Sequence, residues 1–345
     1  MVVMLFRRLL PLALFAAAIS IGIAACSGRD AGVGDEFHTT VPAVATDGSS
    51  ASATASPRAT ATVPPGPSSC TTLPADLKVG GTVVREMLVG TQMRSYRLHL
   101  PPAITSAAGL PVVLNFHGLG SSALEQELYS GLVPLSDGEG FVLVTPDGSG
   151  LPRGWGLSFL ANGNNEDLDF VDALLGTLDH ELCTDAARVY STGMSNGAFF
   201  SSLLGCVRAD SVAAIAPVAG IDWSDTLDCG RPMPVIAFHG NADSTVPYQG
   251  GEIFGVIPYA GAVQNIDSWA AHNGCDTGEK WKQITGHVDE LSHDGCSAPT
   301  LLYTIDGGGH TWPGSISVNR LGPTTSEIDA TQMIWAFFKD KSIPR

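Results

Sequence analysis

One short segment carries the clearest candidate for chemistry. Residues 193–197 read GMSNG, which places Ser195 at the centre of a G-x-S-x-G pattern. A β-branched and aromatic run at 189–192 precedes it, and small and apolar residues follow at helical spacing. Glycines beside the serine permit the close contacts of a sharp strand-to-helix turn. We therefore expect this turn to expose the Ser195 hydroxyl as a nucleophile and to aim the N–H of Asn196 at the group that it attacks.

Two further candidates follow later apolar runs. Asp243 lies in HGNADSTVPY, after run 234–238, and His310 lies in GGGHTWPG, after run 300–305. In open α/β sheets, catalytic groups stand in loops beyond the carboxyl ends of the strands. A histidine in such a loop can accept the serine proton, while a carboxylate orients the histidine and stabilises its positive charge. The chain order Ser195, Asp243, His310 is the order of a triad in the α/β-hydrolase fold.

The loop after run 111–116 predicts the second half of an oxyanion site. It reads HGLG, and the N–H of Leu119 would act there beside the N–H of Asn196. Two histidines, His117 and His239, each precede a glycine at the end of an apolar run. We interpret both as residues that brace their loops by hydrogen bonding.

Other residues compete for the roles of base and acid. Three histidines also follow Asp243 in the chain: His272, His287 and His293. None of them directly follows a core run, and the last two lie among polar residues typical of a solvated surface. Two acids after the preceding strand are alternatives to Asp243: Asp222 and Asp225. Placement in the loops beyond the strands favours Asp243 and His310.

Apolar runs alternate with helical patterns through the rest of the chain. Besides the run before Ser195, we expect strands at 83–88, 93–100, 111–116, 141–145, 212–218, 234–238 and 300–305. The first two would form a hairpin. Near-continuous apolar strands are typical of a parallel sheet that helices cover on both faces. Helical patterns occupy 167–182 and 330–339. The sequence therefore predicts an α/β fold with one mostly parallel central sheet in a single domain.

The first 69 residues differ in composition from the rest. Residues 1–26 resemble an export signal, with two arginines before an apolar stretch that ends in IAAC. We interpret Cys26 as the lipidation site of a lipoprotein signal, with an ordinary secretory signal or an uncleaved anchor as the alternatives. Residues 27–69 are rich in Ala, Thr, Ser and Pro, which predicts a disordered tether. Residues 70–345 suffice for one domain with a full core.

Charge and cysteine usage limit the class of protein. The net charge is −16, and no basic cluster follows the signal, which argues against nucleic acid as a partner. After Cys26, no two cysteines have C-x-x-C spacing, so we expect structural disulfides rather than a metal site. Their pairing stays open at this point. The six cysteines are Cys70, Cys183, Cys206, Cys229, Cys275 and Cys296.

Four segments together resemble one esterase family. The early His-Gly, GMSNGA, HGNADSTVPYQGG and GGGHTWPG are similar to the family that joins polyhydroxybutyrate depolymerases and feruloyl esterases, over residues 70–345. The resemblance implies an α/β-hydrolase fold with Ser195, Asp243 and His310 as its triad. It also implies three disulfides, Cys70–Cys183, Cys206–Cys229 and Cys275–Cys296. One departure lies at 119–122, where this chain has LGSS and family members often carry a cysteine and a glutamine.

These observations predict an exported serine carboxylic ester hydrolase that forms an acyl-enzyme and needs no metal or cofactor. Three aromatic residues are expected to line its substrate site: Trp155, Tyr248 and Trp312. Aromatic walls favour aryl or short hydroxyacyl esters of polymers, including plant polysaccharide. We expect a monomer, held to a membrane by its lipid. The alternatives are a serine peptidase or acyltransferase of the same fold, and a non-catalytic surface-binding lipoprotein.

Overall fold

The computed structural model describes residues 70, 73–157, 165–224 and 226–344. These all belong to a compact unit that spans residues 59–345. The expected signal peptide 1–26, with its lipidation site Cys26, and the expected tether 27–69 lie outside the described residues and stay predictions. Within the described ranges, no helix is both long and apolar enough to cross a membrane.

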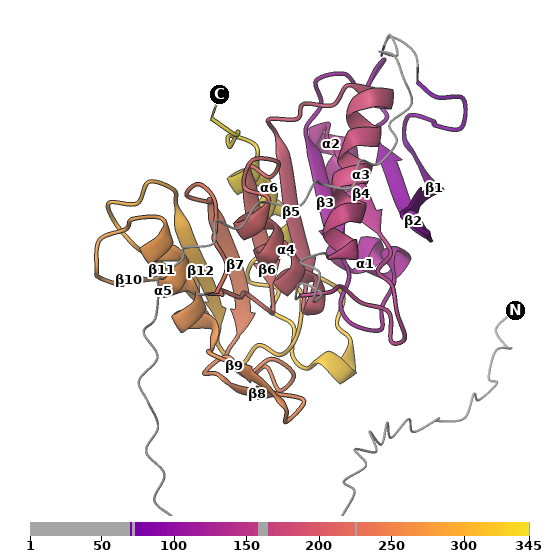
Figure 1. Ribbon diagram of the computed structural model, residues 1–345. Helices are drawn as coiled ribbons and strands as arrows, with labels where there is room; N and C mark the ends of the chain where they lie inside the picture. The colour runs from indigo at the N-terminus through magenta and orange to yellow at the C-terminus, as the bar shows by residue number, and fades with distance from the viewer. Residues whose placement is uncertain (1–69, 71–72, 158–164, 225, 345) are drawn as a thin grey trace, which may run out of the picture. The chain divides into compact units, whose positions relative to one another are not determined.

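A single large sheet organises the described part of the chain (Figure 1). Its ten strands stand in the order β1-β2-β4-β3-β5-β6-β7-β12-β11-β10. From β4 to β12 neighbouring strands are parallel, and the pairs at both edges are antiparallel. The strands are β1 (Gly81–Val89), β2 (Gln92–Leu100), β3 (Val112–Phe116), β4 (Val142–Pro146), β5 (Val189–Met194), β6 (Ala214–Val218), β7 (Val235–Gly240), β10 (Lys280–Gln283), β11 (Val288–Ser292) and β12 (Thr300–Ile305). The predicted mostly parallel sheet is confirmed.

Helices cover both faces of this sheet. One face packs against α3 (Glu166–Leu182), α4 (Asn196–Val207) and α5 (Ala262–His272), and the other against α2 (Leu132–Glu139) and α6 (Ala330–Phe338). A further helix, α1 (Ala123–Ser130), contacts β3 and β4, and a small hairpin joins β8 (Gly251–Ile253) to β9 (Ile257–Tyr259). The helices predicted at 167–182 and 330–339 are α3 and α6.

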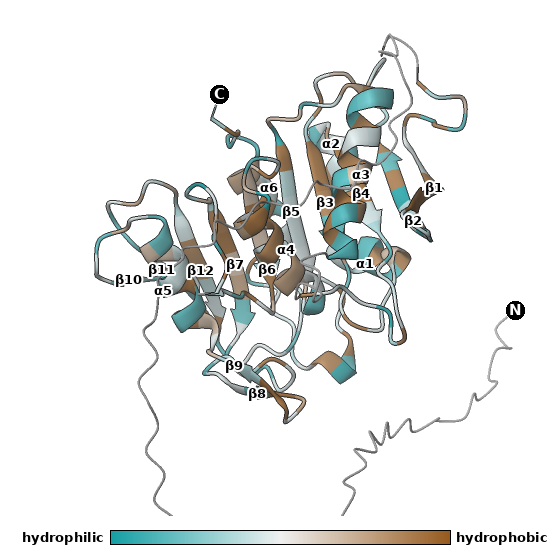
Figure 2. Ribbon diagram, viewed as in Figure 1, coloured by the Kyte–Doolittle hydropathy of each residue, from teal (hydrophilic) through white to brown (hydrophobic). Residues whose placement is uncertain are grey.

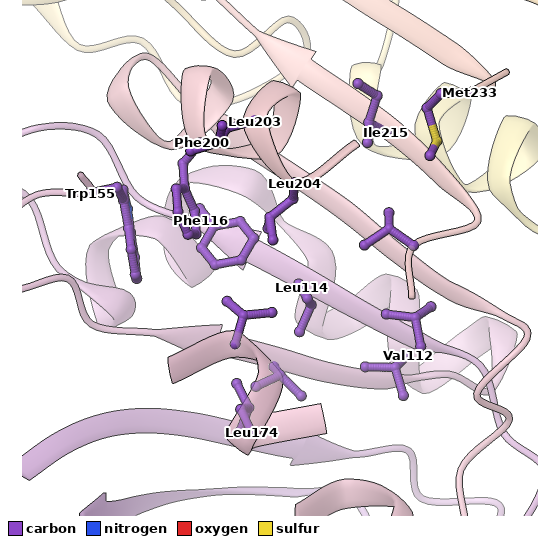
Figure 3. Close-up of a cluster of buried hydrophobic side chains, with 14 of the residues drawn as sticks. Val112, Leu114, Phe116, Trp155, Leu174, Phe200, Leu203, Leu204, Ile215 and Met233 are labelled. Atoms are coloured by element: carbon purple, nitrogen blue, oxygen red, sulfur yellow. The ribbon is translucent and has the colours of Figure 1, made fainter. Parts of the chain in front are cut away.

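The two layers of core follow from the alternation of side chains along a strand. In β3, the side chains of Val112, Leu114 and Phe116 join the core under α3 and α4, whereas Val113 joins the core on the opposite face. Figure 3 shows the first of these layers, where Phe200 from α4 approaches the β3 side chains. A strand with two covered faces favours apolar residues at most positions, which is why these strands appear in the sequence as nearly continuous apolar runs.

The helix after the predicted nucleophile is buried on almost all sides. Residues 197–206 of α4 are buried, and Figure 2 shows this helix mostly in brown, while α3 carries several teal turns. A helix that is apolar all round belongs in the interior of a domain. The elbow, which is the sharp turn of residues 193–197 at the N-terminus of α4, is therefore held by packing along the length of the helix.

Three disulfides link the described chain: Cys70–Cys183, Cys206–Cys229 and Cys275–Cys296. They are the pairs that the family resemblance implies. Cys70–Cys183 joins residues 113 apart in sequence and ties the start of the domain to the C-terminal end of α3. The other two close short loops, with separations of 23 and 21 residues. Disulfides persist in oxidising compartments, so three of them support export of this domain.

The length of the closed loop predicts how much each disulfide stabilises the domain. Removing Cys70–Cys183 by a double serine substitution should cost about 4–5 kcal/mol of unfolding free energy, and removing Cys275–Cys296 about 3 kcal/mol, because a longer loop frees more entropy in the unfolded chain. Denaturant unfolding of the two variants measures both values. Equal losses, or free thiols at these positions in mass spectra of the unreduced domain, would contradict this ranking.

Candidate active site

Ser195 occupies a sharp turn between β5 and α4. Its backbone angles are φ 58° and ψ −122°, a strained combination for a residue with a side chain. Its N–H donates a hydrogen bond of 2.9 Å to the carbonyl of Val218 in β6. Ser195 itself is half-buried, at the carboxyl edge of the parallel strands. The predicted strand–turn–helix is confirmed.

The glycines on either side of Ser195 are required by close backbone contacts. A Cβ on Gly193 would lie 2.6 Å from the carbonyl oxygen of Phe116, and a Cβ on Gly197 would overlap that same oxygen. Only glycine avoids these overlaps without a shift of the backbone. The two glycines of the G-x-S-x-G pattern are therefore needed for the close contact between the elbow and the end of β3.

Asp243 and His310 form a buried pair at the ends of two neighbouring strands. His310 Nδ1 lies 2.7 Å from Asp243 Oδ2, and both side chains are buried. The other carboxylate oxygen of Asp243 accepts hydrogen bonds from the backbone N–H groups of Thr245 (2.8 Å) and Val246 (2.9 Å). These contacts fix the orientation of the carboxylate, which in turn fixes the ring of His310.

The electrostatics of the pair favour an ionised carboxylate. Burial by itself would raise the pKa of Asp243, but the hydrogen bonds from His239 and His310 outweigh burial and hold that pKa well below its usual range. Asp243 is therefore negatively charged throughout the neutral pH range. A charge in this place stabilises a protonated His310 during proton transfer.

Ser195 and His310 are not hydrogen-bonded to each other in the described part of the chain. Ser195 Oγ and His310 Nε2 both lack a hydrogen-bond partner among the described residues. The structure thus joins acid and base directly and presents the nucleophile at the same edge of the sheet. In a structure without a bound substrate, such a contact between nucleophile and base often remains open.

The loop after β3 lies against the nucleophile. A Cβ on Gly118 would lie 3.4 Å from the Cβ of Ser195, so the backbone of this loop reaches the elbow. The N–H groups of Leu119 and Asn196 have no acceptor among the described residues, as the predicted oxyanion role requires. His117 braces the loop, because its Nδ1 lies 2.7 Å from the carbonyl of Gly118 and its Nε2 accepts the N–H of Gly148.

The competing histidines have other partners. His272 Nε2 lies 3.2 Å from the carbonyl of Arg231, His287 pairs with Glu327, and His293 with Asp267. None of these three contacts Asp243 among the described residues. His239 does touch Asp243, at 3.4 Å, but its Nε2 is shared with the carbonyl of Val246 at 3.0 Å and the ring is fully buried. It braces its loop as predicted.

Of the two competing acids, Asp222 is among the described residues and Asp225 is not. The backbone N–H of Asp222 donates to Ser202, and its carbonyl accepts from the Trp269 indole. No histidine contacts its carboxyl group among the described residues, so Asp222 is not paired as a triad acid would be. Asp225 lies outside the described residues.

Two of the three aromatic residues predicted to line the substrate site, Trp312 and Tyr248, lie in the core instead. Trp312 is fully buried and its indole donates to Thr331, which places it in the core against α6. Tyr248 is buried, with its hydroxyl 2.7 Å from Thr304 and its ring edge against His239. Both support the loops of acid and base from beneath, and neither reaches solvent enough to line a substrate site. In the glycine-rich loop that carries His310, the large side chain of Trp312 therefore packs inward against the core.

Trp155, the third predicted aromatic residue, both packs in the core and lines a cavity. Its ring stacks on Phe200 and its indole donates to the carbonyl of His117. It also lines a cavity of ≈ 390 Å³ together with Leu119. Its backbone N–H and C=O pair with the side chain of Asn196, at 2.7 and 3.1 Å. This side-chain role of Asn196 depends on a contact across 41 residues, which no local pattern predicts.

Comparison with known proteins finds relatives that are named as esterases. Feruloyl esterase B of Piromyces equi is 30% identical over 264 residues, which cover 73% of this chain and 46% of that protein. The chain therefore spans about half the length of this relative. Feruloyl esterase D of Neurospora crassa is 29% identical over 278 residues, 76% of this chain and 86% of that protein. No family model matches the chain.

Solved structures agree on the fold. An acetyl xylan esterase from Aspergillus awamori superimposes with a TM-score of 0.51 at 15% identity, over 66% of this chain and 94% of that one. The architecture is that of the α/β-hydrolase fold. The curated relatives support the class of carboxylic ester hydrolases. The curated relatives at about 30% identity are feruloyl esterases, to which the chain is similar over about three quarters of its length. The polyhydroxybutyrate depolymerase side of the predicted resemblance stays a prediction.

The contact beneath the elbow predicts unequal effects of two glycine substitutions. Gly197→Ala should cost about 1–3 kcal/mol of unfolding free energy, because its Cβ meets the backbone of β3 rather than a side chain that can move. It should also lower esterase turnover about 100-fold, since the nucleophile is displaced. Gly138→Ala, at an exposed position of α2 with open space around it, is the matched control and should be neutral or slightly stabilising. Thermal unfolding and turnover with p-nitrophenyl acetate test both; a fully active Gly197→Ala would contradict the contact.

Proposed function

We propose that this protein is an exported serine esterase that cleaves aryl or short hydroxyacyl esters carried on polymers or polysaccharides. The observation that carries the proposal is the buried Asp243–His310 pair at the same sheet edge as the strained Ser195. Relatives named feruloyl esterase and a fold neighbour named acetyl xylan esterase support an ester of this kind as the substrate.

The proposed reaction uses groups of this chain alone. Ser195 Oγ attacks the ester carbonyl carbon while its proton passes to His310 Nε2, and the carbonyl oxygen takes up negative charge. The N–H groups of Leu119 and Asn196 would hold that oxygen. The alcohol leaves with the proton from His310, and an acyl-enzyme remains on Ser195. Water then attacks the acyl-enzyme by the same route, and the acid product is released.

The expected cell location extends the proposal. Three disulfides suit an oxidising compartment, and the sequence of residues 1–26 suits a lipoprotein signal. We propose a monomeric domain on a tether, anchored by lipid at Cys26 and without nucleic-acid partners. The net charge of −16 supports the last point.

Removal of the nucleophile should abolish the acyl-enzyme route. Ser195→Ala should leave the fold unchanged and lower turnover of p-nitrophenyl acetate by about 10³-fold or more. The same variant should no longer be labelled by a fluorophosphonate probe, which reacts only with an activated serine. Labelled peptides from the unsubstituted protein should contain Ser195.

Two histidine variants test the base, with His272→Ala as the matched control for His310→Ala. His310→Ala should lose activity as Ser195→Ala does. His272→Ala should keep it, because among the described residues the His272 ring contacts the carbonyl of Arg231 and the rings of Trp223 and Trp269. Full activity in His310→Ala, together with loss in His272→Ala, would move the role of the base elsewhere.

The anchor is tested separately. Cys26→Ala should release the protein from the membrane fraction, since a cysteine after the signal is the acceptor of the lipid. Fractionation with immunoblotting measures this, and metabolic labelling with a clickable fatty acid should mark only the chain that retains Cys26. Release of both forms alike would favour an ordinary secretory signal.

A further inference from the structure

The loop after β4 lies across both predicted oxyanion residues. The carbonyl of Arg153 in this loop accepts the N–H of Gly120, next to Leu119, at 2.6 Å. A Cβ on Gly154 would lie 2.7 Å from the side chain of Leu119 and 2.8 Å from the side chain of Asn196. The loop therefore contacts the two residues whose N–H groups would form the oxyanion site.

The side chain of Asn196 binds this loop at Trp155. Its Oδ1 accepts the backbone N–H of Trp155 at 2.7 Å, and its Nδ2 donates to the backbone carbonyl of the same residue at 3.1 Å. An amide group can make both bonds because it carries a donor and an acceptor, and the two bonds together prevent its rotation. The N–H of Asn196 is attached to the same Cα as this side chain. Holding the side chain therefore restricts the movement of the N–H that would face the oxyanion.

Further contacts hold Trp155 in place. Its indole N–H donates to the carbonyl of His117 at 2.9 Å. The N–H of the next residue, Gly156, donates to the Asp167 carboxylate at 2.7 Å, and Asp167 forms an ion pair of 2.6 Å with Arg94. Both side chains of this pair are buried, so a movement of Gly156 would cost a buried carboxylate one of its hydrogen bonds. The loop after β4 is therefore a fixed support, tied to α3 and β2.

We propose that the Asn196 side chain positions the oxyanion site: bound to Trp155, it holds the N–H of Asn196 beside that of Leu119. This positioning role rests on the proposed function, since the two N–H groups matter to turnover only if an oxyanion forms. The side chain touches none of the reacting atoms in this role. Donors stabilise an oxyanion most when they are fixed before the charge develops. Loosening one of them should therefore lower kcat more than it changes KM.

Asn196→Ala removes both bonds to Trp155 and keeps the backbone N–H. Its kcat for p-nitrophenyl acetate should fall about 10- to 100-fold while KM changes less than about threefold, because a donor that is loosened but still present loses part of its effect. Phenylboronic acid, whose tetrahedral adduct on Ser195 places an oxygen in the oxyanion site, should inhibit this variant more weakly by a similar factor. Gly154→Ala disturbs the same contact from the other side and should give the same pattern.

Asn273 supplies the matched control. Its side chain makes the same two bonds to a single residue, since it accepts the N–H of Met233 at 2.8 Å and donates to the carbonyl of Met233 at 2.7 Å. It is buried at the C-terminus of α5. Asn273→Ala should therefore lower the free energy of unfolding but leave kcat and the inhibition by phenylboronic acid unchanged. Denaturant unfolding of every variant separates a loss of stability from a loss of positioning.

The unsubstituted protein separates this positioning role from the proposed function. If it neither cleaves p-nitrophenyl acetate nor reacts with a fluorophosphonate probe, the proposed function itself is wrong. If it is active and Asn196→Ala keeps both its kcat and its inhibition by phenylboronic acid, only the positioning role is overturned. A raised KM with unchanged kcat would overturn that role too, as would an equal loss of kcat in Asn273→Ala. Should Asn196→Ala fail to fold, Gly154→Ala decides between the same results.

Discussion

The carbonyl oxygen of Phe116 at the end of β3 meets the backbone of the elbow without room for a side chain between them. This contact sets how close α4 can come to the central strands. It also brings the next loop, with Gly118, against Ser195, and leaves the N–H groups of Leu119 and Asn196 unpaired there. The positions of nucleophile and oxyanion donors thus depend on one steric constraint, which two glycines satisfy.

The core beneath the elbow maintains that constraint. Phe116, Trp155 and Phe200 form a cluster of rings with centroids 5.0–5.1 Å apart (Figure 3). One ring comes from β3, one from the loop after β4 and one from α4, so the cluster joins the three segments that surround the oxyanion site. Because interiors are close-packed, a displacement of any one ring would move the others. The rigidity of the site therefore originates several ångströms below the reacting groups.

Two carboxyl groups near this edge, buried Asp243 and half-buried Asp222, have opposite environments. Asp243 accepts two backbone N–H groups and contacts two histidines, which hold its pKa low despite burial. Asp222 lies among aromatic side chains, and burial dominates and raises its pKa. Residues whose surroundings push their pKa values apart commonly serve different purposes. The hairpin of β8 and β9 packs beside the first environment, since Ile253 and Tyr259 cluster with Phe199 and with Val246, whose N–H donates to Asp243.

The sequence by itself determined the elements whose signals are local. The strand before Ser195, the apolar runs of β3, β4, β7 and β12, the helix α3 and the loops with Asp243 and His310 could all be predicted, because burial on two faces and sharp turns restrict residue types at neighbouring positions. Tertiary structure alone decided the rest. Lys280–Gln283 is exposed and polar apart from Trp281, and it is a strand only because β11 pairs with it. Trp312 and Tyr248 stand beside catalytic candidates in sequence yet point into the core, since side-chain direction depends on packing against elements far away in the chain.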